Sequence, residues 1–261
     1  MLRGIYSAAN AMRYRAQEVD ITANNIANVA TDGFKQDRVA LRSFDRILLS
    51  RISDLTEGEE VTPERFPLGS ATIGGPVALT PFIDFSQGPP KITGNPLDLF
   101  LKGPGFLALE TPAGVRYTRA GSFTLDPTGI IVNQNGLPLL GVDNQPIRIT
   151  SPAPLTINYR GEIIQNRIPV GRIQIVEFPH LNLLEKDGAT LFKPVEPSLT
   201  PLPARETTIE QGAIEMSNVD PINSLIQLIV AQRAYEAASR AVDIFNQSMT
   251  RVSGEIGRLP T

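Results

Sequence analysis

An apolar stripe runs through residues 228–256, which read LIVAQRAYEAASRAVDIFNQSMTRVSGEI. Apolar or small residues recur there at alternating steps of three and four, and these average 3.5 residues, the seam period of a coiled coil. The stripe lasts about four heptads, which is long enough to predict a helix packed along a seam. Its members are Leu228, Ala231, Tyr235, Ala238, Val242, Phe245, Met249, Val252 and Ile256.

The first thirty residues repeat this spacing. The N-terminal stripe consists of Leu2, Ile5, Ala9, Met12, Ala16, Val19, Ala23, Ile26 and Ala30. Taken alone, either stripe also fits an ordinary amphipathic helix on a globular core. Two matched stripes at opposite ends of the chain favour two helices that pack together, and the alternate alanines permit a close approach.

The beginning of the C-terminal helix is apolar on nearly every side. Ile222, Leu225, Ile226, Leu228, Ile229 and Val230 point almost all round the axis. A helix of this kind is buried on several sides, whereas a two-helix pair covers only one. Because an exposed apolar side chain forgoes roughly 1.5–3 kcal/mol, the remaining surface predicts contact with other parts of the chain or with other copies.

Composition excludes several classes of protein. The chain has 261 residues, of which 41% are hydrophobic and 20% are charged, as in a folded protein of one or two domains. The net charge of −3 gives no electrostatic case for nucleic acid. With no cysteine, disulfides, Cys–Zn sites and thiol catalysis are excluded. No run approaches the ~20 apolar residues of a membrane span, and no cleaved signal sequence is expected.

Both helices have clear boundaries in the sequence. The first is predicted from about Leu2 to Asn28, because Asp32-Gly33 forms a turn pair. Ser217, Asn218 or Asp220 is expected to cap the second helix, with Pro221 in its first turn and its end near Gly257. Asn24, Asn25 and Asn28 are unusual in a helix. They indicate either a frayed end or amides that bond to a neighbouring helix or subunit.

The middle of the chain is predicted to be β. Residues 50–92 are rich in Gly, Pro, Ser and Thr and read as extended or irregular structure, with short strands around 77–79 and 82–85. Short strands then recur every 8–12 residues, which favours an antiparallel sandwich or barrel. They are expected at 97–101, 106–110, 115–118, 122–125, 130–133, 137–140, 147–149, 155–158, 162–165 and 171–177, with a return strand at 207–212. Residues 111–114 are expected to form a hairpin loop, and 126–129 a tight turn.

Two terminal motifs resemble a known family. Residues 23–35, ANNIANVATDGFK, resemble the N-terminal signature of the bacterial flagellar axial proteins, the rod and hook subunits. Residues 215–219, EMSNV, and 232–238, QRAYEAA, are similar to the C-terminal signature. In the middle, Gly136–Gly141 (GLPLLG) and Val176-Glu177-Phe178 resemble the proximal rod type more than the distal rod or hook type, although the N-terminal signature does not separate these types.

The resemblance implies a structural subunit of the basal-body rod that assembles into a helical tube and transmits torque. It implies an α+β fold: residues 1–30 and 207–261 form an inner helical bundle, 31–92 connect, and 93–206 form a β-rich outer domain. Implied partners are copies of the chain, other rod and hook proteins and the flagellar export apparatus, without nucleic acid or membrane insertion. The implied location is the rod, which crosses the periplasm. The predicted assembly interface comprises the N-terminal stripe from Leu2 through Ile26 and the C-terminal stripe from Leu228 through Val252, together with Asn24, Asn25 and Asn28.

No catalytic, cofactor or metal site is predicted. His180 is the only histidine and lies in a loop next to Pro179. Lys102-Gly103-Pro104-Gly105 fits a turn better than a phosphate cradle, because Pro104 lacks an N–H donor. The alternatives are a distal rod or hook-type subunit and, from another class, a cell-wall glycan-binding β module with helical arms.

Overall fold

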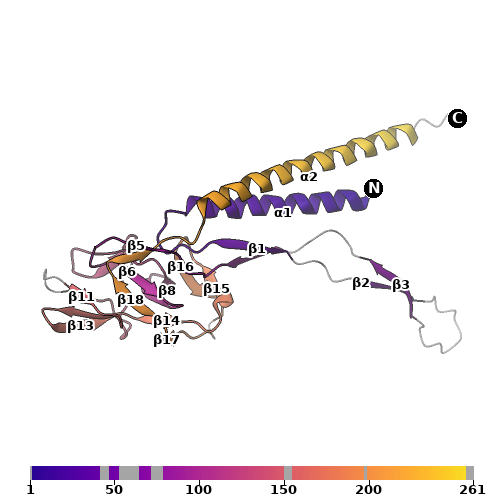
Figure 1. The fold of residues 1–261 in the computed structure, drawn as a ribbon. Coiled ribbons are helices and arrows are strands. Elements are labelled where there is room, and N and C mark those ends of the chain that lie inside the picture. The colour runs from indigo at the N-terminus through magenta and orange to yellow at the C-terminus, as the bar shows by residue number, and fades with distance from the viewer. Residues whose placement is uncertain are drawn as a thin grey trace, which may run out of the picture. The chain divides into compact units, whose positions relative to one another are not determined.

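In the computed structural model the chain begins and ends with a long helix, and the residues between the two helices form antiparallel strands (Figure 1). The structure describes residues 2–41, 47–52, 65–71, 79–149, 155–196 and 199–256. Helix α1 is Leu2–Ala27 and helix α2 is Pro221–Ile256, and the two pack together. The predicted α+β fold class is therefore confirmed, and so are both helix ends to within a residue or two.

The helix boundaries follow the predicted local chemistry. Past the end of α1, Gly33 adopts a positive φ of 67°, which a residue with a Cβ adopts only at a cost. At the start of α2, Oδ1 of Asp220 accepts hydrogen bonds from the N–H groups of Ile222 (3.0 Å) and Asn223 (3.1 Å). Of the three candidate caps, Asp220 is thus the one used, and Pro221 takes the first helical position.

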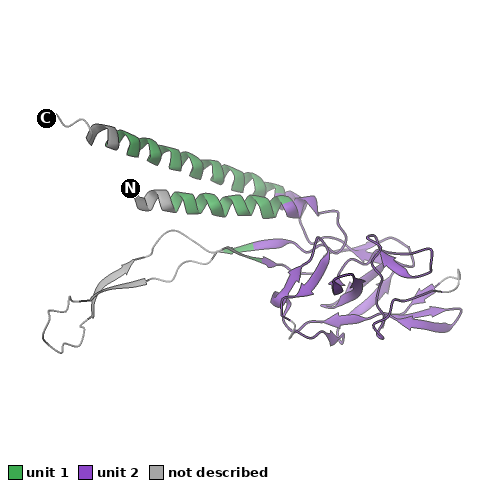
Figure 2. Cartoon of the chain, turned by 180° about the vertical axis from the view of Figure 1, so that it is seen from behind, with its two compact units in different colours: residues 1–23, 39–81, 225–261 green, residues 24–38, 82–224 purple. Residues whose placement is uncertain are grey.

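The chain forms two compact units, shown in different colours in Figure 2. Unit 1 comprises Met1–Ala23, Val39–Pro81 and Leu225–Thr261, and unit 2 comprises Asn24–Arg38 and Phe82–Ser224. The last turn of α1 and the first turn of α2 therefore belong to unit 2 together with most of the strands. Residues 207–224, grouped above with the terminal helices, lie in unit 2.

The largest sheet has six strands in the order β15-β16-β8-β7-β14-β17, and every pairing in it is antiparallel. At its centre β7 and β8 form the predicted hairpin, in which Thr111 faces Gly114. The strands are β7 Phe106–Thr111, β8 Gly114–Thr118, β14 Ile175–Glu177, β15 Leu184–Lys186, β16 Leu191–Pro194 and β17 Leu202–Pro203, with the 3₁₀ turn Leu181–Leu183 before β15.

Smaller sheets complete the β structure. In unit 2, β5 Pro90–Ile92 pairs with β19 Ala213–Glu215, and β6 Leu99–Lys102 pairs with β18 Thr208–Gln211. β9 Phe123–Leu125 and β10 Ile131–Asn133 form a hairpin, and β11 Leu155–Ile157, β12 Glu162–Gln165 and β13 Ile168–Arg172 form a three-stranded sheet. The remaining pairs are β1 Asp37–Leu41 with β4 Leu79–Ile83, and β2 Ile47–Ile52 with β3 Arg65–Ala71.

Three predicted strands differ in the structure. Residues 137–140 and 147–149 contain isolated bridges, such as those of Leu139 to Leu109 and Arg148 to Ile130, instead of regular strands. The expected strand 171–177 is divided into β13 and β14, because Ile173 between them bridges to Gly141. A further strand expected at 77–79 lies largely outside the described residues.

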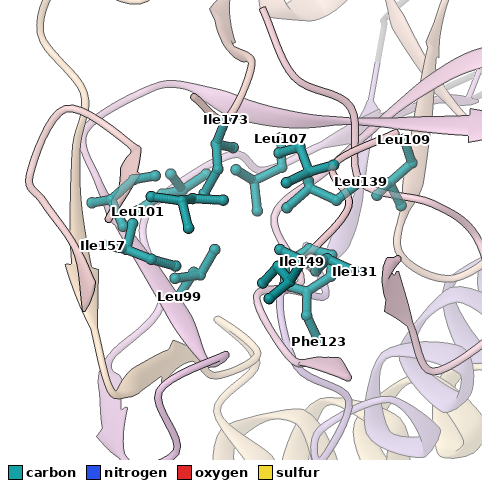
Figure 3. Packing of buried hydrophobic residues seen from close by; sticks show 13 residues of the cluster. Leu99, Leu101, Leu107, Leu109, Phe123, Ile131, Leu139, Ile149, Ile157 and Ile173 are labelled. Atoms are coloured by element: carbon teal, nitrogen blue, oxygen red, sulfur yellow. The ribbon is translucent and has the colours of Figure 1, made fainter. Parts of the chain in front are cut away.

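Unit 2 contains two apolar cores. The first is built mainly from Leu and Ile side chains that converge from β6, β7, β9, β10, β11 and β12, and includes Leu101, Leu107 and Ile163 (Figure 3). The second is aromatic: Phe106 packs edge-on against Phe85, Phe178 and Phe192, each with a centroid distance of 5.7 Å. Such edge-to-face pairs contribute about 0.5–1.5 kcal/mol beyond area burial. Among the described residues no helix is both long and apolar enough to cross a membrane.

Candidate assembly surface and its anchor

Asn25 ties the last turn of α1 to strand β1. Its Nδ2 donates to the carbonyl of Asp37 at 2.8 Å, and its Oδ1 accepts from the N–H of Asp37 at 2.9 Å. The residue is only 6% exposed. Asn28 instead donates to the carbonyl of Asn24 at 2.9 Å and thereby closes the helix end. The amides of Asn25 and Asn28 thus bond within the chain, which neither sequence interpretation foresaw.

A buried ion pair joins the two terminal signatures. Nζ of Lys35 lies 2.6 Å from Oε1 of Glu215, and neither side chain is accessible to solvent. The same ammonium donates to the carbonyl of Ser86 at 2.7 Å, and Oε1 also accepts from the N–H of Gly88 at 2.8 Å. Each charge therefore has additional polar partners, which is what a buried pair requires to be tolerated.

Arg119 adds a second buried cation to this pair. Its Nη1 lies 3.5 Å from Oε2 of Glu215, and its guanidinium stacks 4.9 Å from the ring centroid of Phe106. Nε of Arg119 is buried without a hydrogen-bond partner. Two cations therefore share one carboxylate, and burial lowers the pKa values of both Lys35 and Arg119, while Glu215 opposes that shift.

Backbone contacts join the same two signatures. The N–H of Gly33 donates to the carbonyl of Glu215 at 2.7 Å. Oδ1 of Asn218 accepts from the N–H of Gln36 at 2.8 Å, and its Nδ2 donates to the carbonyl of Asp84 at 2.8 Å. We call Lys35, Arg119, Glu215, Asn218 and Gly33 the anchor. It holds the chain just after α1 against the chain just before α2.

Sequence reasoning placed both signatures in the family but missed the anchor. Lys35 is the last residue of the first motif and Glu215 is the first residue of the second, and neither motif indicates that these side chains meet. Their signal was a charge within each motif next to residues such as Phe34, which is 1% exposed. Lys and Glu are almost never fully buried unless they are paired, and the sequence does not show the pairing. Hydrophobic patterning therefore predicts that both side chains lie at the surface.

The stripe of α2 follows the more covered face of that helix as far as Phe245, whereas in α1 partial burial is not confined to the stripe. Ala9, Met12, Ala16, Val19 and Ile26 of α1 are partly buried, and Ala23 is exposed. In α2, Ala231 is 1% exposed, and Leu228, Tyr235, Ala238, Val242 and Phe245 are partly buried. Exposure reaches 38% at Met249 and 39% at Val252. The side chains of Leu2 and Ile5 lie outside the described residues.

A second apolar face of α2 is exposed. The large side chains near the start of the helix are those for which the sequence predicted a need of partners. Their exposed fractions are 70% for Ile222, 47% for Leu225, 55% for Ile226, 52% for Ile229 and 56% for Val230. Clustered exposed apolar groups of this kind mark sites of protein–protein contact.

Within the described part of the chain, no group of three or more His, Cys, Asp or Glu residues is arranged to hold a metal ion. His180 is exposed and precedes the 3₁₀ turn. The arrangement of helices, anchor and exposed apolar face suits mechanical assembly.

Comparison with known proteins identifies three matching family models. The model "Flagella basal body rod protein" matches residues 5–35, "Flagellar hook protein FlgE/F/G D1 domain" matches residues 100–165, and "Flagellar basal body rod FlgEFG protein C-terminal" matches residues 210–254. The first match contains Lys35, and the last contains Glu215 and Asn218. The motifs that meet in the anchor are therefore those that two of the models detect.

Individual relatives cover nearly the whole chain. The flagellar basal-body rod protein FlgF of Caulobacter vibrioides is 35% identical over 87% of this chain and 86% of its own length. The flagellar hook-basal body complex protein FlhO of Bacillus subtilis is 29% identical over 99% of this chain and 100% of its own. The flagellar basal-body rod protein FlgG of Bacillus subtilis is 30% identical over 93% of this chain and 94% of its own length. The chain therefore belongs to the flagellar basal-body rod FlgEFG family and is a structural, non-enzymatic subunit of the rod.

Proposed function

We propose that this subunit is of the proximal rod type. In support, the FlgF relative is more identical to it, at 35%, than the FlgG relative from Bacillus subtilis, at 30%. The distal rod type is expected to carry a Gly/Asn-rich run before its final helix. In this chain the corresponding segment before β18 is rich in proline instead, with Pro194, Pro197, Pro201 and Pro203. The competing assignment is a distal rod or hook-type subunit.

The terminal helices carry the assembly in this proposal. The two stripes pack against those of neighbouring copies, and the exposed face of α2 around Ile226 contacts further subunits. The observation that supports this most directly is the exposure of five large apolar side chains within the first three turns of α2. Full burial of each contributes about 1.5–3 kcal/mol, so association regains what the isolated chain forgoes. Contacts that repeat without closing produce a helical tube, which then transmits torque.

The same proposal assigns the layers of the subunit. Residues 1–30 with 207–261 line the inner layer, 31–92 connect it to neighbours, and 93–206 fill the outer shell. Partners are copies of the chain, other rod and hook proteins and the flagellar export apparatus. The rod segment so formed crosses the periplasm, and the chain reaches it by that apparatus.

Imaging of purified basal bodies tests the proposal. A tag inserted after Asn135, in an exposed turn of unit 2, should label the rod close to its inner-membrane end and at its outer circumference. Label at the hook-proximal end would transfer the chain to the distal type. Label along the rod axis would reverse the proposed layers.

A further inference from the structure

A cavity of about 250 Å³ opens beside the β13–β14 segment of unit 2. Its floor is apolar and includes Ile173, Ile175 and Val176, and its other walls are provided by Pro201, Pro203 and Ala204 beside β17. A volume of this size admits one or two amino-acid side chains. None of the residues that line it belongs to the anchor or to the stripes.

Two arginines at the cavity have no acidic partner. Arg160 and Arg172 both line it, and neither forms an ion pair with any described residue. Nε of Arg172 donates to the carbonyl of Arg160 at 3.3 Å, and the guanidinium of Arg160 lies 5.3 Å from the ring centroid of Tyr159. The side chain of Arg172 therefore lies against the backbone of Arg160, and among the described residues no carboxylate neutralises either guanidinium, so both charges remain available to an anion.

Gln174 presents an unused acceptor in the same wall. Its Nε2 donates to Oδ1 of Asn144 at 2.9 Å, which fixes the orientation of the amide. Its Oε1 is buried and accepts no hydrogen bond. A buried acceptor without a donor costs about 1–3 kcal/mol.

Three exposed apolar side chains either line the cavity, as Val142 does, or adjoin its lining residues in the sequence. Val142 is 59% exposed, Tyr159 58% and Leu202 51%. Arginine and tyrosine are the residues most enriched at protein interfaces, and an apolar rim excludes water around such a contact. Pro201 and Pro203 flank Leu202 in β17, and because they lack N–H groups they limit addition of a partner strand at this sheet edge.

We propose that this cavity receives an Asp or Glu side chain from an adjacent rod subunit. The carboxylate pairs with Arg160 and Arg172. Charge complementarity favours this occupant, since acidic residues outnumber basic ones by 27 to 24 in this chain and two guanidinium groups lack carboxylates here. The contact would lock neighbouring β units together independently of the helices. It rests on the proposed assembly of the chain with other rod proteins.

Site-specific photo-crosslinking tests the contact in the full chain. Benzoylphenylalanine replaces Val142 at the rim or, as control, Asn135 in an exposed turn that does not line the cavity. After irradiation of purified basal bodies, we expect the residue at 142 to link to an acidic segment of another subunit, which the residue at 135 does not reach. If the subunit is present in basal bodies at its normal amount and residue 142 forms either no link or only links within its own chain, the inference is overturned. Absence of the unmodified chain from basal bodies instead refutes the proposed function.

Charge reversal provides the second measurement. The variant Arg160→Glu/Arg172→Glu should lower the yield of the intermolecular link at least about tenfold, which corresponds to about 1.4 kcal/mol. Replacing the linked carboxylate by Lys should restore it. Arg148→Glu, an exposed arginine away from the cavity, serves as control and should leave the yield unchanged. An unchanged yield in the double variant overturns the inference, and so does protection of residue 142 by soluble peptidoglycan fragments.

Discussion

Nζ of Lys35 lies 2.6 Å from Oε1 of Glu215, and both side chains are fully buried although 180 residues separate them along the chain. The pair joins the segment after α1 to the segment before α2. The pair therefore holds the end of α1 close to the start of α2, in addition to its contribution to stability.

Lys35→Met should destabilise unit 2 strongly. The substitution keeps a long side chain but leaves the Glu215 carboxylate with only Arg119 and the N–H of Gly88. Removing one partner of a buried pair costs about 3–5 kcal/mol. Urea unfolding followed by circular dichroism measures the loss. Lys91→Met, at an exposed lysine, is the control, and similar small losses in both variants would contradict the role assigned to the pair.

Gly33→Ala should cost more than Gly136→Ala. Both glycines have positive φ, 67° and 75°, so both substitutions carry a backbone penalty of about 1–2 kcal/mol. A Cβ on Gly33 would lie 2.2 Å from the backbone nitrogen of Ala120, whereas one on Gly136 meets nothing within 4 Å. Overpacking therefore adds about 1–3 kcal/mol at Gly33 alone. Equal free energies of unfolding for the two variants would show that the backbone near Ala120 moves to accommodate the added methyl group.

Asn25→Asp should destabilise the chain, and Asn24→Asp should have little effect. The aspartate retains an acceptor for the N–H of Asp37 but loses the donor to its carbonyl, and it places a second carboxylate close to Asp37. An unsatisfied buried group costs about 1–3 kcal/mol. Asn24 is exposed on the same helical turn, so it controls for the change in charge. Thermal unfolding of both variants tests this prediction.

Glu177→Gln should flatten the acid dependence of stability. Burial alone would raise the pKa of Glu177, but hydrogen bonds from the Thr207 hydroxyl and from the N–H groups of residues 205–207 lower it on balance below the ordinary 4.5. A depressed pKa in the folded state means stability that is present above 4.5 and is lost as the pH falls through the folded value. Urea unfolding between about pH 2 and 7 should show a smaller slope in the variant. An identical slope would mean that this carboxylate contributes nothing to the acid transition.

Val242→Asp or Val19→Asp should abolish rod assembly without unfolding unit 2. Each places a charge in a partly buried position of a stripe, where an unpaired carboxylate is disfavoured. Gln247→Asp, at an exposed polar position of α2, is the matched control. Motility in soft agar and melting of the purified chain are the two measurements. Normal motility of either stripe variant would refute the predicted interface.

The sequence predicted what local rules determine. The 3.5-residue spacing predicted both helices, and Asp220 with Pro221 predicted the start of α2. The turn from Asp126 to Gly129 predicted the β9–β10 hairpin. Long-range pairings were beyond such rules. Nothing local indicates that β18 pairs with β6 or that Lys35 meets Glu215, because these contacts depend on the whole path between them. The predicted layers and interface residues remain predictions.

Because the anchor clamps Gly33 to Glu215, everything between them is a closed loop with fixed ends. The entropy of closing a flexible loop grows only with the logarithm of its length, about 0.6 kcal/mol for each doubling. Evolution is therefore free to enlarge or shrink the intervening module at little thermodynamic expense. The same pair of terminal helices is thus compatible with intervening modules of different size.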